Sequence, residues 1–161
     1  MACRNRAKGE EQRSRLVAQY PASSIEVMVV DVSIPASVYA FCDEFRSRFK
    51  SVDTVFCNAG VLPVKGLRYR ILFETLLRRG VEHIILTGAE DFLVQSQHLI
   101  TKEGLGEVFA TNIFGHFLLV SELQDMMAGG RIVWTSSTSA DKTYFSWDDP
   151  QHRSGYVFNI Y

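Results

Sequence analysis

The sequence predicts an α/β fold built on a doubly wound parallel sheet, and three observations support this prediction. Short apolar runs rich in β-branched residues, at 25–32, 53–57 and 131–135, have the length and composition of strands covered on both faces. Segments with helical periodicity alternate with these runs along the chain. Polar residues follow each run directly, as expected where a parallel strand ends. Such alternation is typical of βα units, in which helices cover both faces of the sheet.

Length, composition and charge fit one ordinary globular domain. The chain has 161 residues, of which 47% are apolar, and a formal net charge of −1. This balance provides no overall positive field for nucleic acid, so any basic binding surface must be local. No apolar run reaches the roughly 18–20 residues of a spanning helix, and the charged first residues do not resemble a secretory signal. Three cysteines without C-x-x-C spacing predict reduced thiols, and therefore an intracellular, cytoplasmic setting.

Two helices are predicted in the first third of the chain. Residues 4–19 are rich in charged and amide side chains, which indicates a solvated helix that ends before Pro21. Ser33 is placed to cap a second helix, and Pro35 to occupy its first turn. Between 38 and 49, apolar residues recur at spacings of three and four, so this helix should present an apolar stripe to the sheet.

The region 62–99 lacks a clear period and is interpreted as an insertion. Its apolar residues interleave with lysine and arginine between Lys65 and Arg79. This run is compatible with a membrane-surface helix, although a substrate-side insertion packed on the domain is favoured by about two to one. A polar start at Thr101 precedes the longest predicted helix, at 105–127, which has a wide apolar face.

Motifs of mostly polar residues follow the predicted strands, at the edge where parallel sheets collect their chemistry. These motifs are Arg4-Asn5, Asp31-Val32, Asn58-Ala59-Gly60 and Ser136-Ser137. Taken singly, each has a structural explanation, because asparagine and glycine favour turns, serine caps helices, and an arginine among other arginines suits a solvated helix face. The four histidines share no ligand spacing and are expected to be structural or exposed, so no metal site is predicted.

Two further motifs complete an ordered set: Thr111 to Phe117, which reads TNIFGHF, and Thr135-Ser136-Ser137. With Ala2-Cys3-Arg4-Asn5 and the other strand-end motifs, this set resembles the short-chain dehydrogenase/reductase family over nearly all of the chain. Within that family, residues 58–152 are most similar to 3-keto-steroid reductases. The resemblance implies a Rossmann-like domain, NADP(H) as cofactor, and reduction of a 3-keto or 17-keto group of a sterol or steroid. It also implies the endoplasmic reticulum membrane surface, with peripheral membrane contact, and it is compatible with a homo-oligomer.

The resemblance assigns cofactor contacts to the first motifs. Arg4, with Asn5 beside it, would contact the 2′-phosphate that distinguishes NADP from NAD, because a guanidinium can fork onto phosphate oxygens. Asp31 would accept the amino group of the adenine, and Val32 would pack on the face of that ring. The Asn58-Ala59-Gly60 turn would let the backbone approach the cofactor closely.

The resemblance also assigns two catalytic residues. Asn112 would be the asparagine whose place in a helix supports a bound water used in proton relay. Ser137 would hydrogen-bond the substrate carbonyl as negative charge builds on its oxygen, while Ser136 beside it is the weaker candidate. The acid of the family is a tyrosine followed four residues later by a lysine. Neither Tyr156, which has Ile160 at the lysine position, nor Tyr161 fits that pattern.

We therefore expect one partial dinucleotide-binding domain over 1–161, with the insertion at about 62–99 and a divergent tail at 153–161. The sequence also contains no glycine-rich loop after a first strand. The expected sheet is incomplete, lacking the first strand and the C-terminal strands, so that two half sheets would present unpaired edges. On this interpretation the chain is catalytically incomplete.

Two alternatives stay open at this point. The chain could be a non-enzymatic truncated form that pairs with a full-length reductase or has no stable function. It could also be a nucleotide-binding α/β domain of another chemistry, such as a methyltransferase in which Asp31 binds a ribose. The second alternative gives no reason for Asn58-Ala59-Gly60, Asn112 and Ser137 to occur together.

Overall fold

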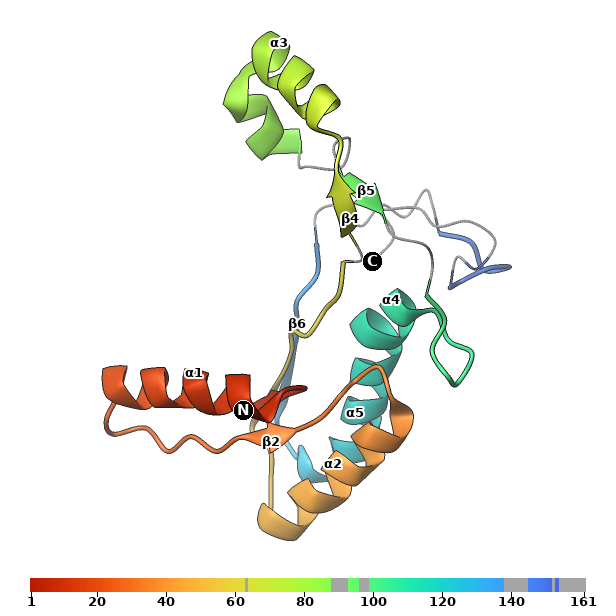
Figure 1. Ribbon diagram of the computed structural model, residues 1–161. Helices are drawn as coiled ribbons and strands as arrows, with labels where there is room; N and C mark the ends of the chain where they lie inside the picture. The colour runs from red at the N-terminus through yellow and green to blue at the C-terminus, as the bar shows by residue number, and fades with distance from the viewer. Residues whose placement is uncertain (63, 88–92, 96–98, 138–144, 152, 154–161) are drawn as a thin grey trace. The chain divides into compact units, whose positions relative to one another are not determined.

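The computed structural model divides the chain into two compact units (Figure 1). The first contains Met1–Ala59 and Ile113–Thr135, and the second contains Gly60–Asn112 and Ser136–Tyr161. The structure describes residues 1–62, 64–87, 93–95, 99–137, 145–151 and 153. Most of the predicted tail, with Tyr156 and Tyr161, lies outside the described residues. Each unit is described by itself.

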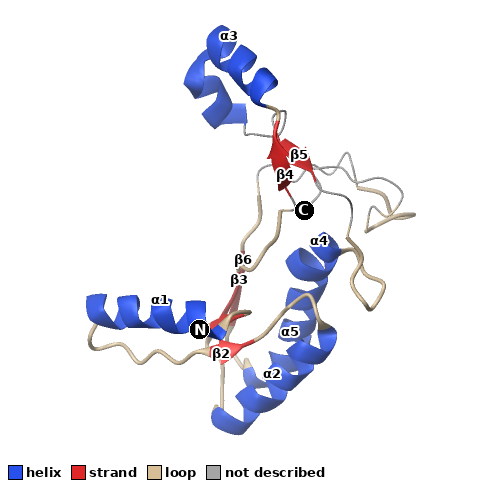
Figure 2. Cartoon of the chain, viewed as in Figure 1, coloured by secondary structure: helices blue, strands red, loops and turns tan. Residues whose placement is uncertain are grey.

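Parallel strands form the sheets of the first unit, as the sequence predicted (Figure 2). Strand β1 (Ala2–Cys3) pairs with β2 (Met28–Val29), and β3 (Thr54–Cys57) pairs with β6 (Arg131–Trp134). Among the described residues of this unit, the two pairs are separate sheets. The strand predicted at 25–32 is shorter than expected, because its partner β1 offers only two residues for pairing.

Helix α1 (Arg6–Gln19) follows β1 directly. Asn5 caps the helix, since its side-chain oxygen accepts the backbone N–H of Lys8 at 3.0 Å. The helix ends at Tyr20, just before Pro21, as predicted. The sequence therefore located this helix within two residues at its start.

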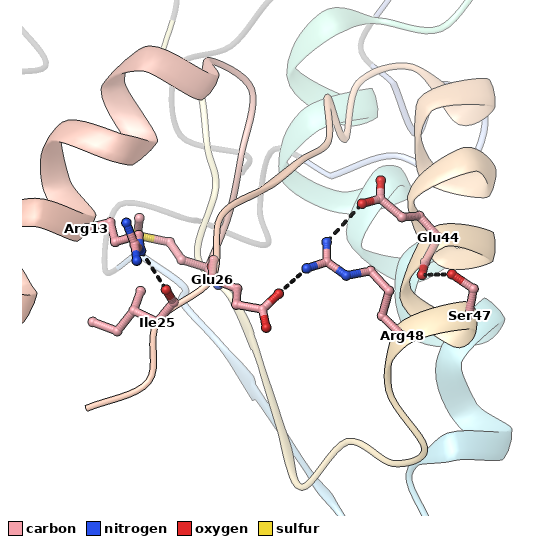
Figure 3. Close-up of polar contacts among 7 residues, drawn as sticks. Arg13, Ile25, Glu26, Glu44, Ser47 and Arg48 are labelled. Carbon is pink, nitrogen blue, oxygen red and sulfur yellow. Dashed lines mark hydrogen bonds and ion pairs between the residues drawn. The ribbon is translucent and has the colours of Figure 1, made fainter. Parts of the chain in front are cut away.

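Helix α1 packs closely on the β1–β2 pair through its buried residue Gly9. A Cβ atom at Gly9 would lie 2.6 Å from Cys3 Sγ and 2.8 Å from Val27 Cγ1, so only glycine fits without a shift. Arg13 adds a second contact between α1 and the segment before β2, since its Nε donates to the carbonyl of Ile25 at 2.7 Å (Figure 3).

Helix α2 (Pro35–Arg48) carries the predicted apolar stripe, and it packs against helix α5 (Gly115–Leu123) as well as β2. Ile34, not Ser33, occupies the N-cap position, because the Ser33 hydroxyl donates to the carboxylate of Asp31 instead. The buried core of this unit consists of Met28, Val30, Val32, Val38, Phe41, Cys42, Leu119 and Leu123.

Arg48 joins α2 to the segment that precedes β2 (Figure 3). Its guanidinium forms ion pairs with Glu44 at 3.0 Å and with Glu26. These side chains are more than one-third exposed, so each pair contributes only about 0–1 kcal/mol to stability. The network orients the segment more than it stabilises the fold.

The longest predicted helix is helical throughout 107–126 but changes its hydrogen-bond pattern. It begins with α4 (Glu107–Phe109), widens into a π-helical segment (Ala110–Phe114), and continues as α5 and a short 3₁₀ turn. Thr101 does not cap it, because its backbone closes a separate turn with Leu105 and the helix starts after Gly106. A π-helical segment inside an α-helix is rare and occurs frequently at functional sites.

The region predicted as an insertion contains a strand pair and a helix. Strand β4 (Val64–Leu67) pairs antiparallel with β5 (Leu93–Gln95), and α3 (Tyr69–Thr87) lies between them in the chain. Gly80 interrupts α3 with a φ of 75°. In the part of the chain that the structure describes, no helix has the length and apolar character needed to cross a membrane.

Candidate functional site

The carboxyl ends of β3 and β6 bring two predicted motifs side by side. Cys57 pairs with Trp134 in parallel register, so Asn58 and Thr135 both follow at the same end of the sheet. The Thr135 hydroxyl donates to the side-chain oxygen of Asn58 at 2.9 Å. The Asn58-Ala59-Gly60 turn and the Thr135-Ser136-Ser137 motif therefore begin at one edge of the β3–β6 pair.

His116 braces this turn from α5. Its side chain is 3% exposed, and its Nε2 lies 2.7 Å from the backbone oxygen of Ala59. Because a carbonyl only accepts, Nε2 carries the proton. The other ring nitrogen, Nδ1, is buried without a hydrogen-bond partner among the described residues. Trp134 packs edge-on against the ring, with 5.5 Å between centroids.

Asn112 braces the residue after the turn, from within the π-helical segment. Its side-chain oxygen accepts the Val61 N–H at 2.8 Å, and its side-chain nitrogen donates to the Val61 carbonyl at 3.1 Å. A Cβ atom at Gly60 would lie 3.5 Å from the Asn112 oxygen, so this backbone and the amide are in close contact. Both ends of the Asn112 amide are thus used to hold one backbone residue.

Asp31 follows β2 and is half-buried. Its Oδ1 accepts from the backbone N–H of Ser33 at 3.0 Å and from the Ser33 hydroxyl at 2.6 Å. Its backbone N–H donates to the Ser37 hydroxyl at 2.9 Å. Its second carboxylate oxygen, Oδ2, has no hydrogen-bond partner within the described ranges. Val32 lies in the buried core, so its side chain packs against protein.

Arg4 and Asn5 follow β1, beside the β2 end, because Cys3 pairs with Val29. Arg4 is exposed and makes no hydrogen bond or ion pair with any residue that the structure describes. The first turn of α1 contains Arg6 and Lys8 and no acidic residue. Cations at the positive end of a helix dipole are unfavourable, so a bound anion would relieve the repulsion there.

The predicted site residues are divided between the two units. The first unit contains Arg4, Asn5, Asp31, Val32, Asn58 and Ala59, and the second contains Gly60, Asn112, Ser136 and Ser137. Both serines are exposed. The structure brings Asn58 to Thr135 within the first unit and Asn112 to Gly60 and Val61 within the second.

The thiols next to these elements are structural. Burial raises the pKa of Cys42 from 9.0 to about 11, and burial also raises the pKa of Cys57. A thiol with a raised pKa is protonated at neutral pH and is a poor nucleophile. Among the described residues, no group of three or more histidine, cysteine or carboxylate side chains could hold a metal ion.

Comparison with known proteins identifies relatives over almost the whole chain. The family described as short chain dehydrogenase matches residues 1–148. The Homo sapiens 3-keto-steroid reductase/17-beta-hydroxysteroid dehydrogenase 7 is 40% identical over 159 residues, which cover 96% of this chain and 46% of that protein. The Rattus norvegicus protein of the same name is 37% identical over 159 residues, covering 96% of this chain and 47% of that protein. The resemblance predicted from the motifs is thereby confirmed.

Solved structures show the same fold. Salutaridine reductase from Papaver somniferum superposes with a TM-score of 0.65 at 21% identity, covering 90% of this chain and 50% of that one. The similarity confirms an α/β, Rossmann-like fold with parallel strands. The chain spans about half the length of the relatives that it matches.

Proposed function

Because the chain belongs to the short-chain dehydrogenase family, we propose that it supplies part of an NADP(H)-dependent oxidoreductase that reduces a sterol or steroid ketone. The observation that carries this proposal is the junction of Asn58 and Thr135 at the carboxyl ends of two parallel strands. Ligands of open α/β sheets bind outside those strand ends. The steroid specificity is supported by the names of the human and rat relatives.

The residues after β1 and β2 fit the adenosine half of a nicotinamide nucleotide. The Oδ2 of Asp31, which has no partner in the described part of the chain, can accept the amino group of the adenine, while its Oδ1 is held by Ser33. Arg4 has no competing partner among the described residues and sits before a helix start that lacks acidic side chains. Both properties suit the 2′-phosphate of NADP. The Asn5 oxygen is committed to the helix cap, so only its amide nitrogen remains for the cofactor.

Asn112 and Ser137 have separate roles in the proposed reaction. When bound, the reduced nicotinamide supplies the hydride. The Ser137 hydroxyl donates a hydrogen bond to the ketone oxygen as charge builds there. The Asn112 side chain fixes Val61, which leaves the backbone of the π-helical segment to hold a water. The sequence contains no Tyr-x-x-x-Lys acid, so we expect no turnover by the chain alone.

A titration of NADPH fluorescence with the purified chain tests the cofactor site. We expect NADPH to bind more tightly than NADH, and Arg4→Ala to weaken NADPH binding by about tenfold or more while leaving NADH unchanged. Arg15→Ala is the matched control, because Arg15 lies within α1, the helix that follows Arg4, and is ion-paired there with Glu11. Equal affinity for the two nucleotides, or an equal effect of both substitutions, would contradict the proposal.

A second function is favoured by the exposed apolar residues of the β3–β6 pair. Phe56 is 70% exposed and Ile132 is 48% exposed, although both lie in strands. Strands of parallel sheets are normally covered on both faces and paired at both edges. We infer that β1–β2 and β3–β6 are halves of one sheet, and that the face of the β3–β6 pair that carries Phe56 contacts a full-length reductase. Co-purification with such a reductase, and its loss in Phe56→Ser, is the expected result; no association would exclude this function.

A further inference from the structure

Helix α3 carries an exposed apolar stripe that the proposed function does not use. Gly80, with φ 75° and ψ 172°, separates a first helical piece, 69–79, from a second. In the first piece, five apolar residues recur at the spacing of one helix face. They are Tyr69, Leu72, Phe73, Leu76 and Leu77, and we call them the α3 stripe.

The α3 stripe is largely exposed. Tyr69 is 73%, Phe73 60% and Leu77 71% exposed, and Leu76 is 39% exposed. Single exposed apolar residues are ordinary, but a continuous apolar face of this kind marks an interaction surface. The opposite side of the helix contains Arg78, Glu74 and the isolated apolar residue Ile71, as the rotation of 100° per residue requires.

Positive charge surrounds the α3 stripe. Between Lys65 and Arg79 the sequence has five basic residues and one acidic residue, in a chain whose net charge is −1. By helical geometry Arg70 and Arg79 border the stripe on its two sides. Arg70 is 91% exposed, although it is also paired with Glu74 at 3.0 Å. Long basic side chains in such positions can lie along apolar surface and place their charges among lipid phosphates.

We propose that the α3 stripe lies in the interface of an anionic phospholipid membrane, parallel to its surface. The apolar side chains of the stripe are then buried among the lipids, and the neighbouring basic side chains are attracted to the anionic headgroups. This combination is typical of interfacial amphipathic helices. Charge complementarity selects an anionic lipid surface over a neutral one. The inference is independent of the proposed reductase activity, since no residue of the candidate site belongs to α3.

Flotation of the full chain with lipid vesicles tests the proposal. Vesicles of equimolar phosphatidylcholine and phosphatidylserine should carry the chain upward in a density gradient, and pure phosphatidylcholine vesicles should carry far less. Phe73→Ser and Leu77→Ser should each lower vesicle partitioning by about tenfold or more, because each removes an apolar side chain that the membrane would bury. Ile71→Ser is the matched control, with the same chemistry on the opposite side of the same helix, and should bind like the original chain.

Three measurements decide whether the α3 stripe binds an anionic membrane. Both stripe residues are exposed, so their serine variants should keep the original circular dichroism spectrum. Release of the chain by high salt would support the Coulomb contribution. Failure to float with anionic vesicles, equal flotation with both lipid compositions, or an equal loss in Ile71→Ser and Leu77→Ser would overturn the proposal.

Discussion

Removal of the Asn112 side chain should release the backbone of Val61. Asn112→Ala deletes two hydrogen bonds, of 2.8 Å and 3.1 Å, that hold the N–H and carbonyl of Val61. Both residues are half-buried, so each bond contributes about 1 kcal/mol, and their joint loss costs about 2 kcal/mol locally. Since about 1.4 kcal/mol corresponds to a factor of ten, the Val61 amide should exchange its hydrogen about 30-fold faster.

Residue-resolved hydrogen exchange measures this change directly. Asn58→Ala is the matched control, because Asn58 lies three residues before Val61 and its side chain bonds Thr135 instead. Unchanged exchange at Val61 in Asn112→Ala, or the same acceleration in Asn58→Ala, would refute the assignment of the amide as a local brace.

Asn112→Asp distinguishes the contributions of the two hydrogen bonds between Asn112 and Val61. At neutral pH the aspartate still accepts the Val61 N–H but has no proton for the Val61 carbonyl, which it then faces with a second oxygen. Protection of the Val61 amide should therefore fall less than in the alanine variant. It should recover as pH falls below about 3.9, where the carboxyl gains a donor. Absence of this recovery would show that the donor end of the amide is dispensable.

Two further perturbations test the first unit. Cys42, whose folded pKa is raised from 9.0 to about 11, stabilises the fold fully below pH 9.0 and loses this contribution as pH rises through about 11. Urea unfolding should show a larger decline over that range than in Cys42→Ala, which retains Cys57, and an equal decline in both proteins would contradict the assignment. Gly9→Ala should destabilise by about 1–2 kcal/mol, because overpacking against Cys3 and Val27 outweighs the helix propensity of alanine. Gly66→Ala is the control, because no atom of the described residues lies within 4 Å of its added Cβ, and equal urea midpoints for both variants would refute the packing argument.

The regular elements could be predicted because their signals are local. Helices α1 and α2 start and stop at caps, prolines and apolar spacings that lie within the segments themselves. The strand at 25–32 was overestimated, since the length of a strand depends on its partner as well as on its own composition. The sequence shows no clear period over α3 because Gly80 interrupts the helix. Only the piece 69–79 has one apolar face.

The candidate site was predictable where it depends on strand ends. Asn58 and Thr135 meet because parallel strands in register must end together, and register follows from two short apolar runs. The side-chain roles could not be obtained in this way. The cofactor motifs did not indicate that Asn5 caps a helix or that Val32 belongs to the core. Contact of Val32 with adenine stays a prediction. Whether Asn112 and Ser137 are catalytic stays a prediction.

His116 is the residue whose role the sequence analysis missed, although the TNIFGHF motif contained the signal. Asn112 and His116 are four residues apart on one helical run, a spacing that places side chains on the same side of a helix. Within the second unit Asn112 holds Val61, and within the first unit His116 holds Ala59. The two braced residues flank Gly60, which is the residue of the turn with least resistance to backbone motion. The physical meaning of the motif is therefore that each of the two side chains fixes the backbone of one residue within its own unit, Asn112 that of Val61 and His116 that of Ala59.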